Sequence, residues 1–219
     1  EALRTPTPAT LHPRNMRILC LGDVVGKPGR KALEVLLPPF VRERGIDLVV
    51  ANGENVAGGS GMTEPMFSRL RHHGVDAVTM GDHVYKRREI YPLLKESDRI
   101  VRPANLPAEA IGPAFSVVRT ATGVDVAFFC LLGRLYMKPA DCPFHAADRV
   151  LGQIAALPSQ PKVIVVDVHA EATSEKLALA NHLAGRVSIV FGTHTHIATA
   201  DEQIIAGHTA YITDAGMTG

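Results

Sequence analysis

The chain has 219 residues, of which 46% are apolar and 21% charged, as in an average folded domain, and this excludes a disordered chain. Lys and Arg total 23 against 22 Asp and Glu, so the formal net charge of +1 predicts no nucleic-acid-binding surface. Aromatic residues are 5% and Trp is absent, which argues against a base-stacking platform. No apolar run reaches the roughly 18 residues that span a bilayer, so the sequence predicts no membrane segment. The three scattered cysteines predict reduced thiols in a cytoplasmic protein.

Residues 1–15 are rich in Pro and Thr and lack the apolar stretch of a secretory signal, so they predict a flexible leader before one domain over 16–219. Apolar runs then alternate with stretches of helical spacing. The apolar runs predict strands at residues 17–25, 46–51, 75–80, 162–168, 187–191 and 209–213. The helical spacing predicts helices at residues 29–44, 63–73, 86–95, 146–157 and 174–183. Pro38 and Pro39 predict that the first helix ends or kinks there.

This alternation of strands and helices favours a layered α/β domain. The strand runs are almost continuously apolar, which is typical of strands covered on both faces. Two further β-rich runs, at 114–120 and 124–132, surround Ala121-Thr122-Gly123 and predict a hairpin. The predicted fold is therefore α/β, with mixed β-sheets sandwiched by helices.

Polar side chains follow five of the predicted strands. They are Asp23, Glu54 and Asn55, Asp82 and His83, His169, and His194 and His196. In open α/β sheets, ligands bind outside the carboxyl ends of the strands, so these side chains are expected to meet at one edge. Each one alone is weak evidence, because Asp after Gly is common in turns and a single His-x-His is a frequent accident. Together they are the oxygen and nitrogen ligands of divalent transition metals and predict a metal site.

Two metal ions explain this donor set better than one. A closed structural zinc site uses about four ligands, usually with Cys, whereas here there are more donors and none is a Cys. A carboxylate such as Glu54 can bridge two cations. Such a pair polarises a phosphoryl oxygen and lowers the pKa of a bound water towards ~7, so metal-bound hydroxide forms near neutral pH. The residues therefore predict metal-dependent hydrolysis of a phosphoester.

Several longer blocks of sequence carry a resemblance to a known family. They lie at residues 22–30, 52–55, 101–107, 169–179, 192–196 and 210–219. In this order they resemble the calcineurin-like metallophosphoesterase superfamily and, more narrowly, the bacterial YmdB-like phosphodiesterases, from about residue 16 to the last residue. The resemblance implies a layered metallophosphoesterase fold and a small-molecule phosphodiester substrate, most specifically a 2′,3′-cyclic or 3′,5′-cyclic nucleotide.

The resemblance also implies a role for each site residue. The first metal ion would be held by Asp23, Glu54, Asn55 and His196. The second would be held by Glu54, Asp82, His169 and His194. Glu54 would bridge the two ions, and His83 would donate a proton to the leaving oxygen. The implied cofactors are two divalent or mixed-valence transition-metal ions, iron or manganese.

The chain departs from the family pattern at Asp82, where the third motif normally has Asn, and at its end, because family members continue beyond Gly219. Val25 replaces a His of the wider superfamily, a change typical of the YmdB-like group, and Asn55 would supply the replacement donor. A short C-terminus could leave an exposed sheet edge, which predicts a possible homo-oligomer. Lys138 could meet a substrate phosphate or lie in a solvated loop. Two other functions stay open: a phosphomonoesterase with the same site, and a weakly active metal-binding regulatory protein.

Overall fold

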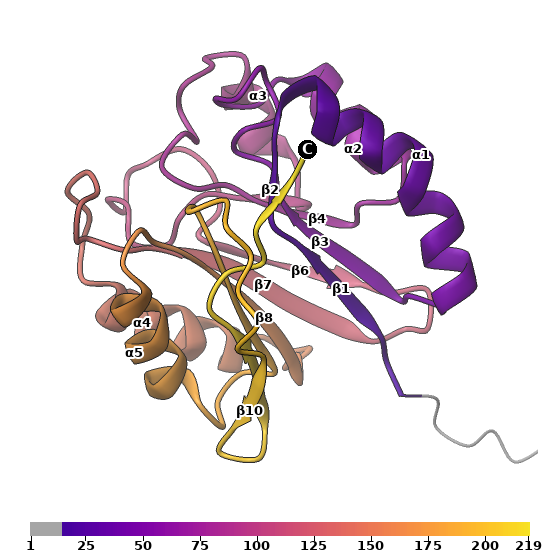
Figure 1. Cartoon of the computed structure of the whole chain (residues 1–219). Helices are drawn as coiled ribbons and strands as arrows, with labels where there is room; N and C mark the ends of the chain where they lie inside the picture. Colours follow the sequence, from indigo (N-terminus) through magenta and orange to yellow (C-terminus); the bar gives the residue numbers. More distant parts are fainter. Residues whose placement is uncertain (1–14) are drawn as a thin grey trace, which may run out of the picture.

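The computed structural model describes residues 15–219 (Figure 1). The predicted leader falls almost entirely on residues 1–14, which lie outside the described residues. The first sheet is parallel, with the strand order β1-β3-β4-β5. Its strands are β1 (Ile18–Leu21), β3 (Leu48–Asn52), β4 (Ala77–Thr79) and β5 (Ile100–Val101).

The second sheet is mixed and has the order β10-β11-β9-β8-β7-β6. Its strands are β6 (Phe115–Arg119), β7 (Asp125–Leu132), β8 (Val163–His169), β9 (Ile189–Thr193), β10 (Gln203–Ile205) and β11 (Thr209–Ile212). The pairs β6–β7 and β10–β11 are antiparallel and the others are parallel, so the predicted hairpin and mixed sheet are confirmed. A short parallel pair joins β2 (Asp23–Val24) to the C-terminal β12 (Met217–Thr218).

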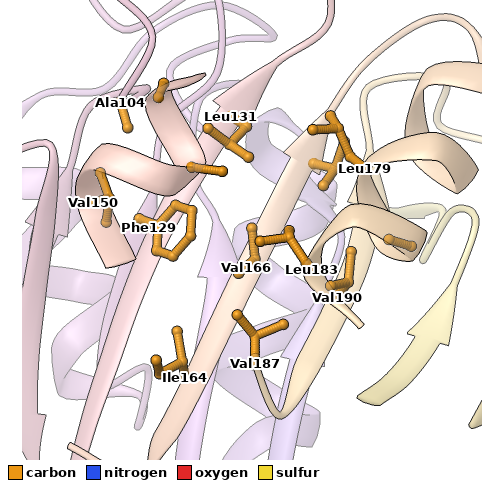
Figure 2. Packing of buried hydrophobic residues seen from close by; sticks show 14 of the residues in the cluster. Ala104, Phe129, Leu131, Val150, Ile164, Val166, Leu179, Leu183, Val187 and Val190 are labelled. Atoms are coloured by element: carbon orange, nitrogen blue, oxygen red, sulfur yellow. The ribbon is translucent and has the colours of Figure 1, made fainter. Parts of the chain in front are cut away.

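Helices cover the outer face of each sheet, which gives four layers (Figure 1). The helices are α1 (Gly26–Arg44), α2 (Glu64–His72), α3 (Ile90–Glu96), α4 (Pro143–Ala155) and α5 (Thr173–Leu183). In Figure 2, Val150 of α4 and Leu179 and Leu183 of α5 lie with Phe129 of β7 and Val166 of β8 in one buried cluster. On the first sheet, α1, α2 and α3 make the corresponding cluster. Within residues 15–219, no helix combines the length and apolarity that a bilayer crossing needs.

A third core lies between the two sheets. Along β3, Val49 and Ala51 face the helices, whereas Leu48 and Val50 face the second sheet and pack with residues such as Phe128. This alternation explains why the strand was predicted as an unbroken apolar run, since both of its faces are covered. The face-to-face packing also brings the carboxyl ends of β3, β4, β8 and β9 to a common edge of the molecule.

Some predicted elements differ from the structure. The strand predicted over 17–25 divides at Gly22 into β1 and β2, because β1 pairs with β3 whereas β2 pairs with β12. Helix α1 continues past Pro38 and Pro39 to Arg44, so these prolines do not end it. The third predicted helix begins at Ile90 rather than at residue 86. The local pattern predicts no strand at β5, β10 or β12, which have only two or three residues each.

Candidate metal centre

The structure brings all eight predicted site residues to one edge. Asp23 opens β2, Glu54 and Asn55 follow β3, Asp82 and His83 follow β4, His169 ends β8, and His194 and His196 follow β9. Three overlapping groups have donor atoms within 4.8 Å of one another. The groups are Asp23-Glu54-His169, Glu54-Asp82-His83 and Asp82-His169-His194. The side chains that follow the predicted strands therefore converge. His196 belongs to the same cluster because its Nε2 lies 3.5 Å from Asp23 Oδ1.

One side of the cluster is formed by Asp23, Asn55 and His196. The Asp23 carboxylate is fully buried, and its Oδ1 lies 3.5 Å from Nε2 of His196. The Asn55 amide nitrogen lies 3.0 Å from Asp23 Oδ1 and 3.2 Å from His196 Nε2, while its oxygen faces His83 Nδ1 at 2.9 Å. The amide must therefore turn over before its oxygen can serve as a ligand between Asp23 and His196.

The other side is formed by Asp82, His169 and His194. His169 is fully buried, and its Nε2 lies 3.1 Å from His194 Nδ1 and 3.5 Å from Asp82 Oδ1. His194 and His196 both have positive φ values, 94° and 65°, which are rare for residues with a side chain. Such backbone conformations cost about 1–3 kcal/mol each and persist only where the surroundings enforce them.

Glu54 lies between the two sides. Its Oε1 is 3.3 Å from His169 Nε2 and 3.2 Å from His83 Nδ1, and its Oε2 accepts a hydrogen bond of 2.9 Å from the His83 backbone N–H. Only 1% of Glu54 is exposed, whereas the His83 side chain is 30% exposed. A buried carboxylate with donors on both sides is suited to bridge two cations, and a partly exposed imidazole beside it can reach a substrate.

The electrostatics of the cluster favour a cation. Burial alone would raise the pKa of Glu54, but the charge and hydrogen bonds of His169 and His83 hold that pKa well below its usual value. Burial would likewise lower the pKa of His169, yet Glu54 and Asp82 raise it well above the usual value for histidine. The neighbouring His169, whose Nε2 lies 3.5 Å from Asp82 Oδ1, lowers the pKa of Asp82. The carboxylates therefore remain charged and create a negative field at this edge.

Two details show that the donor set fits metal ions. Among residues 15–219, Asp82 Oδ1 is the one buried side-chain oxygen or nitrogen that lacks a hydrogen-bond partner, and a metal ion would satisfy it. Gly81 precedes it, and a Cβ at this position would collide with Glu54 Oε2 and with His169 Nε2. The backbone thus leaves the space between these two donors free of side chain. The donors are oxygens and imidazole nitrogens, which suit divalent cations.

Sequence reasoning missed several residues that support the site. Asp167 and Lys176 are fully buried charged residues within β8 and α5. Glu175 accepts hydrogen bonds of 2.9 and 3.1 Å from the backbone N–H groups of residues 134 and 135. Lys138, for which the sequence left a phosphate contact and a solvated loop open, was not missed, and its ammonium lies 3.5 Å from Asp82 Oδ2 at the rim of the cluster. A charged residue inside an apolar run, as in Lys162–Val168, was the signal that could have identified Asp167.

Comparison with known proteins gives consistent results. A family model described as "YmdB-like protein" matches residues 19–219. The chain is 44% identical over 204 residues to the 2′,3′-cyclic-nucleotide 2′-phosphodiesterase of Bacillus subtilis (strain 168), covering 93% of this chain and 76% of that protein. The crystal structure of a hypothetical protein from Thermus thermophilus has a TM-score of 0.85 at 45% identity, over 93% of this chain and 77% of the other. That of a novel phosphatase from Mycoplasma pneumoniae has a TM-score of 0.83 at 31% identity, over 92% and 72%.

The four-layer fold and the cluster of oxygen and nitrogen donors at one sheet edge define a metallophosphoesterase, an enzyme that hydrolyses phosphoesters and binds divalent metal ions. Within this class, the chain belongs to the YmdB-like protein family, whose model matches nearly its whole length.

Proposed function

We propose that this enzyme is a phosphodiesterase that hydrolyses 2′,3′-cyclic nucleotides at a dinuclear metal centre. The observation that carries the proposal is the pair of donor groups, one on each side of the buried Glu54 carboxylate. The activity named for the Bacillus subtilis relative, at 44% identity, supports the substrate class. The cyclic phosphate of such a nucleotide is a diester whose charge matches a site that holds cations.

The donor positions support one assignment of ligands. One ion is assigned to Asp23, Glu54, Asn55 and His196, and the other to Glu54, Asp82, His169 and His194. We propose iron or manganese for both positions, as the resemblance to the YmdB-like family implies, and the carboxylate, amide and imidazole ligands are compatible with these ions. Two cations held in this way would polarise the phosphoryl oxygens and stabilise the charge that develops during the displacement.

The protein's own residues then handle the proton and the substrate. His83 Nδ1 lies 3.2 Å from Glu54 Oε1, so the other ring nitrogen is available to give a proton to the leaving sugar oxygen. Lys138 lies within reach of Asp82 at the rim, where its ammonium can meet the phosphate. The partly exposed His83 and the exposed Lys138 are thus the two groups that contact substrate from the solvent side.

The test is a substrate panel on protein loaded with Fe²⁺ or Mn²⁺ under anaerobic conditions. The panel comprises 2′,3′-cyclic AMP, 3′,5′-cyclic AMP, bis-p-nitrophenyl phosphate and p-nitrophenyl phosphate. We expect 2′,3′-cyclic AMP to give the highest kcat/KM, and His194→Ala to abolish both metal loading and turnover. His208→Ala is the matched control, because His208 is exposed and lies outside the donor groups. A normal metal content in His194→Ala contradicts the ligand assignment.

A phosphomonoesterase is the second candidate, and the Mycoplasma pneumoniae neighbour, described as a phosphatase, favours it. Faster hydrolysis of p-nitrophenyl phosphate than of its diester would select this function. A protein that loads metal and binds the cyclic nucleotide without turnover would instead indicate a regulatory binder.

We also propose that the protein is cytoplasmic and forms a homo-oligomer. The unpaired Cys20, Cys130 and Cys142 support a reducing compartment. Strand β1 is the edge of the first sheet, and Leu36 and Phe40 are exposed beside it, which supports contact with a second copy. Light scattering of the purified protein will measure its mass in solution, and a monomer contradicts the oligomer.

A further inference from the structure

A buried hydrogen-bond network lies directly behind His169. At its centre is the Asp167 carboxylate of β8, which is fully buried. Its Oδ2 accepts hydrogen bonds of 2.9 Å from the Asn52 amide and 2.5 Å from the Thr79 hydroxyl, both in the first sheet. Its Oδ1 accepts one of 2.6 Å from the Thr193 hydroxyl in the second sheet. The carboxylate therefore links the two sheets beneath the metal centre.

The Thr193 hydroxyl also faces His169, with its Oγ1 2.8 Å from the ring Nδ1. A hydroxyl carries a single proton, and here the 2.6 Å contact with the Asp167 carboxylate uses it. At 2.8 Å the Thr193 oxygen can then act only as acceptor, so His169 Nδ1 must carry a proton and donate it. The Asn52 amide nitrogen is also near Nδ1, but at the longer distance of 3.3 Å. If Thr193 donated to His169 instead, Oδ1 of Asp167 would be left without a donor.

We propose that Thr193 and Asp167 are positioning residues that fix the tautomer of His169, keeping a proton on Nδ1 so that Nε2 can bind a metal ion. The inference rests on the proposed function, because it takes His169 as a ligand. Nε2 is the nitrogen that faces the donor cluster, 3.3 Å from Glu54 Oε1 and 3.1 Å from His194 Nδ1. A carboxylate behind a metal-binding histidine raises the basicity of that ligand and holds its ring in place.

The network offers a matched pair of substitutions. Thr193→Val and Thr79→Val each remove one hydroxyl that donates to Asp167, at 2.6 and 2.5 Å, and both residues are buried. Only Thr193 contacts His169, since the other contact of Thr79 is the carbonyl of Ala51 at 3.5 Å. If Thr193 has only a structural role, the two substitutions should change metal affinity to a similar extent. If Thr193 controls the tautomer, only Thr193→Val should weaken metal binding. Thr193→Ser keeps the hydroxyl and serves as the rescue.

The first measurement is the affinity for Zn²⁺, by competition with a chromophoric chelator. We expect Thr193→Val to bind Zn²⁺ about 10- to 100-fold more weakly than the wild type, the usual loss when the partner of a ligating histidine is removed. Thr79→Val and Thr193→Ser are expected to stay within about threefold of the wild type. Equal affinities of Thr193→Val and Thr79→Val overturn the inference.

The second measurement is the ¹H–¹⁵N NMR spectrum of the histidine rings in the metal-free and Zn²⁺-loaded protein, with His169→Gln for assignment. We expect the Nδ1 proton of His169 to exchange slowly with water in the wild type and markedly faster in Thr193→Val. The absence of that proton from both wild-type forms overturns the inference whatever the affinities. A wild type that shows the proton but binds no Zn²⁺, Fe²⁺ or Mn²⁺ refutes the proposed function and leaves the tautomer assignment supported.

Discussion

Replacing Lys176 with Met will remove one half of an ion pair that lies wholly inside the protein. Lys176 Nζ is 2.5 Å from Oδ2 of Asp214, and the exposed fractions of the two side chains are 0% and 1%. The Asp214 carboxylate would remain buried with two donors, the Thr195 hydroxyl at 2.7 Å and the Gly216 backbone N–H at 2.8 Å. Because an uncompensated charge would then lie in the interior, the free energy of unfolding should fall by about 3–5 kcal/mol.

In a domain of this size 1 kcal/mol corresponds to about 2–4 °C, so the Tm should fall by about 6–20 °C. Thermal unfolding followed by circular dichroism will measure the change. Lys31→Met is the matched control, because Lys31 pairs with Glu34 at 2.9 Å but the two side chains are 64% and 48% exposed. An exposed pair contributes about 0–1 kcal/mol, so the control should lose less than about 4 °C.

A double substitution tests whether the buried charge causes the loss. Lys176→Met combined with Asp214→Asn removes both charges, keeps an oxygen that accepts from the Gly216 N–H, and offers an amide N–H that can donate to the Thr195 oxygen. This variant should therefore be more stable than Lys176→Met alone. Equal stability of the single and double variants, or a Lys176→Met protein as stable as Lys31→Met, refutes the reasoning.

Three further predictions concern the metal centre and the thiols. Asp82→Asn removes a negative charge from the cluster, so we expect cation binding to weaken by at least about tenfold and kcat at full metal loading to rise; a lower kcat with both metals bound contradicts this. Mn²⁺ at about 100 times its Kd should stabilise the wild type by about 2.7 kcal/mol, or about 5–11 °C in Tm, and Glu54→Gln should abolish that rise. Iodoacetamide at pH 8 should modify Cys142 first, and mass spectrometry will show which cysteine is alkylated. Burial and the charge of Asp167 raise the pKa of Cys20 to about 12, so little of the reactive thiolate forms at Cys20.

The sequence alone was sufficient to predict where the donors converge, because that follows from strand topology. In a layered α/β fold the residues after the parallel strands of one sheet share an edge, and the packing of the two sheets then brings Glu54 to His169 although 115 residues separate them. Short elements escaped prediction for a physical reason. The strands β5 and β12 have two residues each, and their pairing with β4 and β2 comes from tertiary packing rather than from a local pattern.

The supporting groups could not be predicted from local patterns. Asp167 depends on partners in other strands, including Asn52, which lies 115 residues away, and the partner of Lys176 lies 38 residues away. A lone Asp or Lys in an apolar element looks like an interruption until the fold supplies its partner. The effect of a proline on a helix also depends on tertiary contacts. Helix α1 continues through Pro38, and its residues Leu33 and Leu37 are buried against the first sheet.

The segment at the end of β9 depends both on its own sequence and on contacts with distant residues. Its sequence alternates Thr193-His194-Thr195-His196, and each threonine donates to a different buried carboxylate, Asp167 in one case and Asp214 in the other. The two histidines between and after them have positive φ values, which cost energy unless the neighbouring residues are fixed. Since the threonines are tied to the interior, the histidines are held at the donor cluster before any cation arrives. His194 and His196 are therefore preorganised, and little of the binding free energy of a metal ion is lost in ordering this loop.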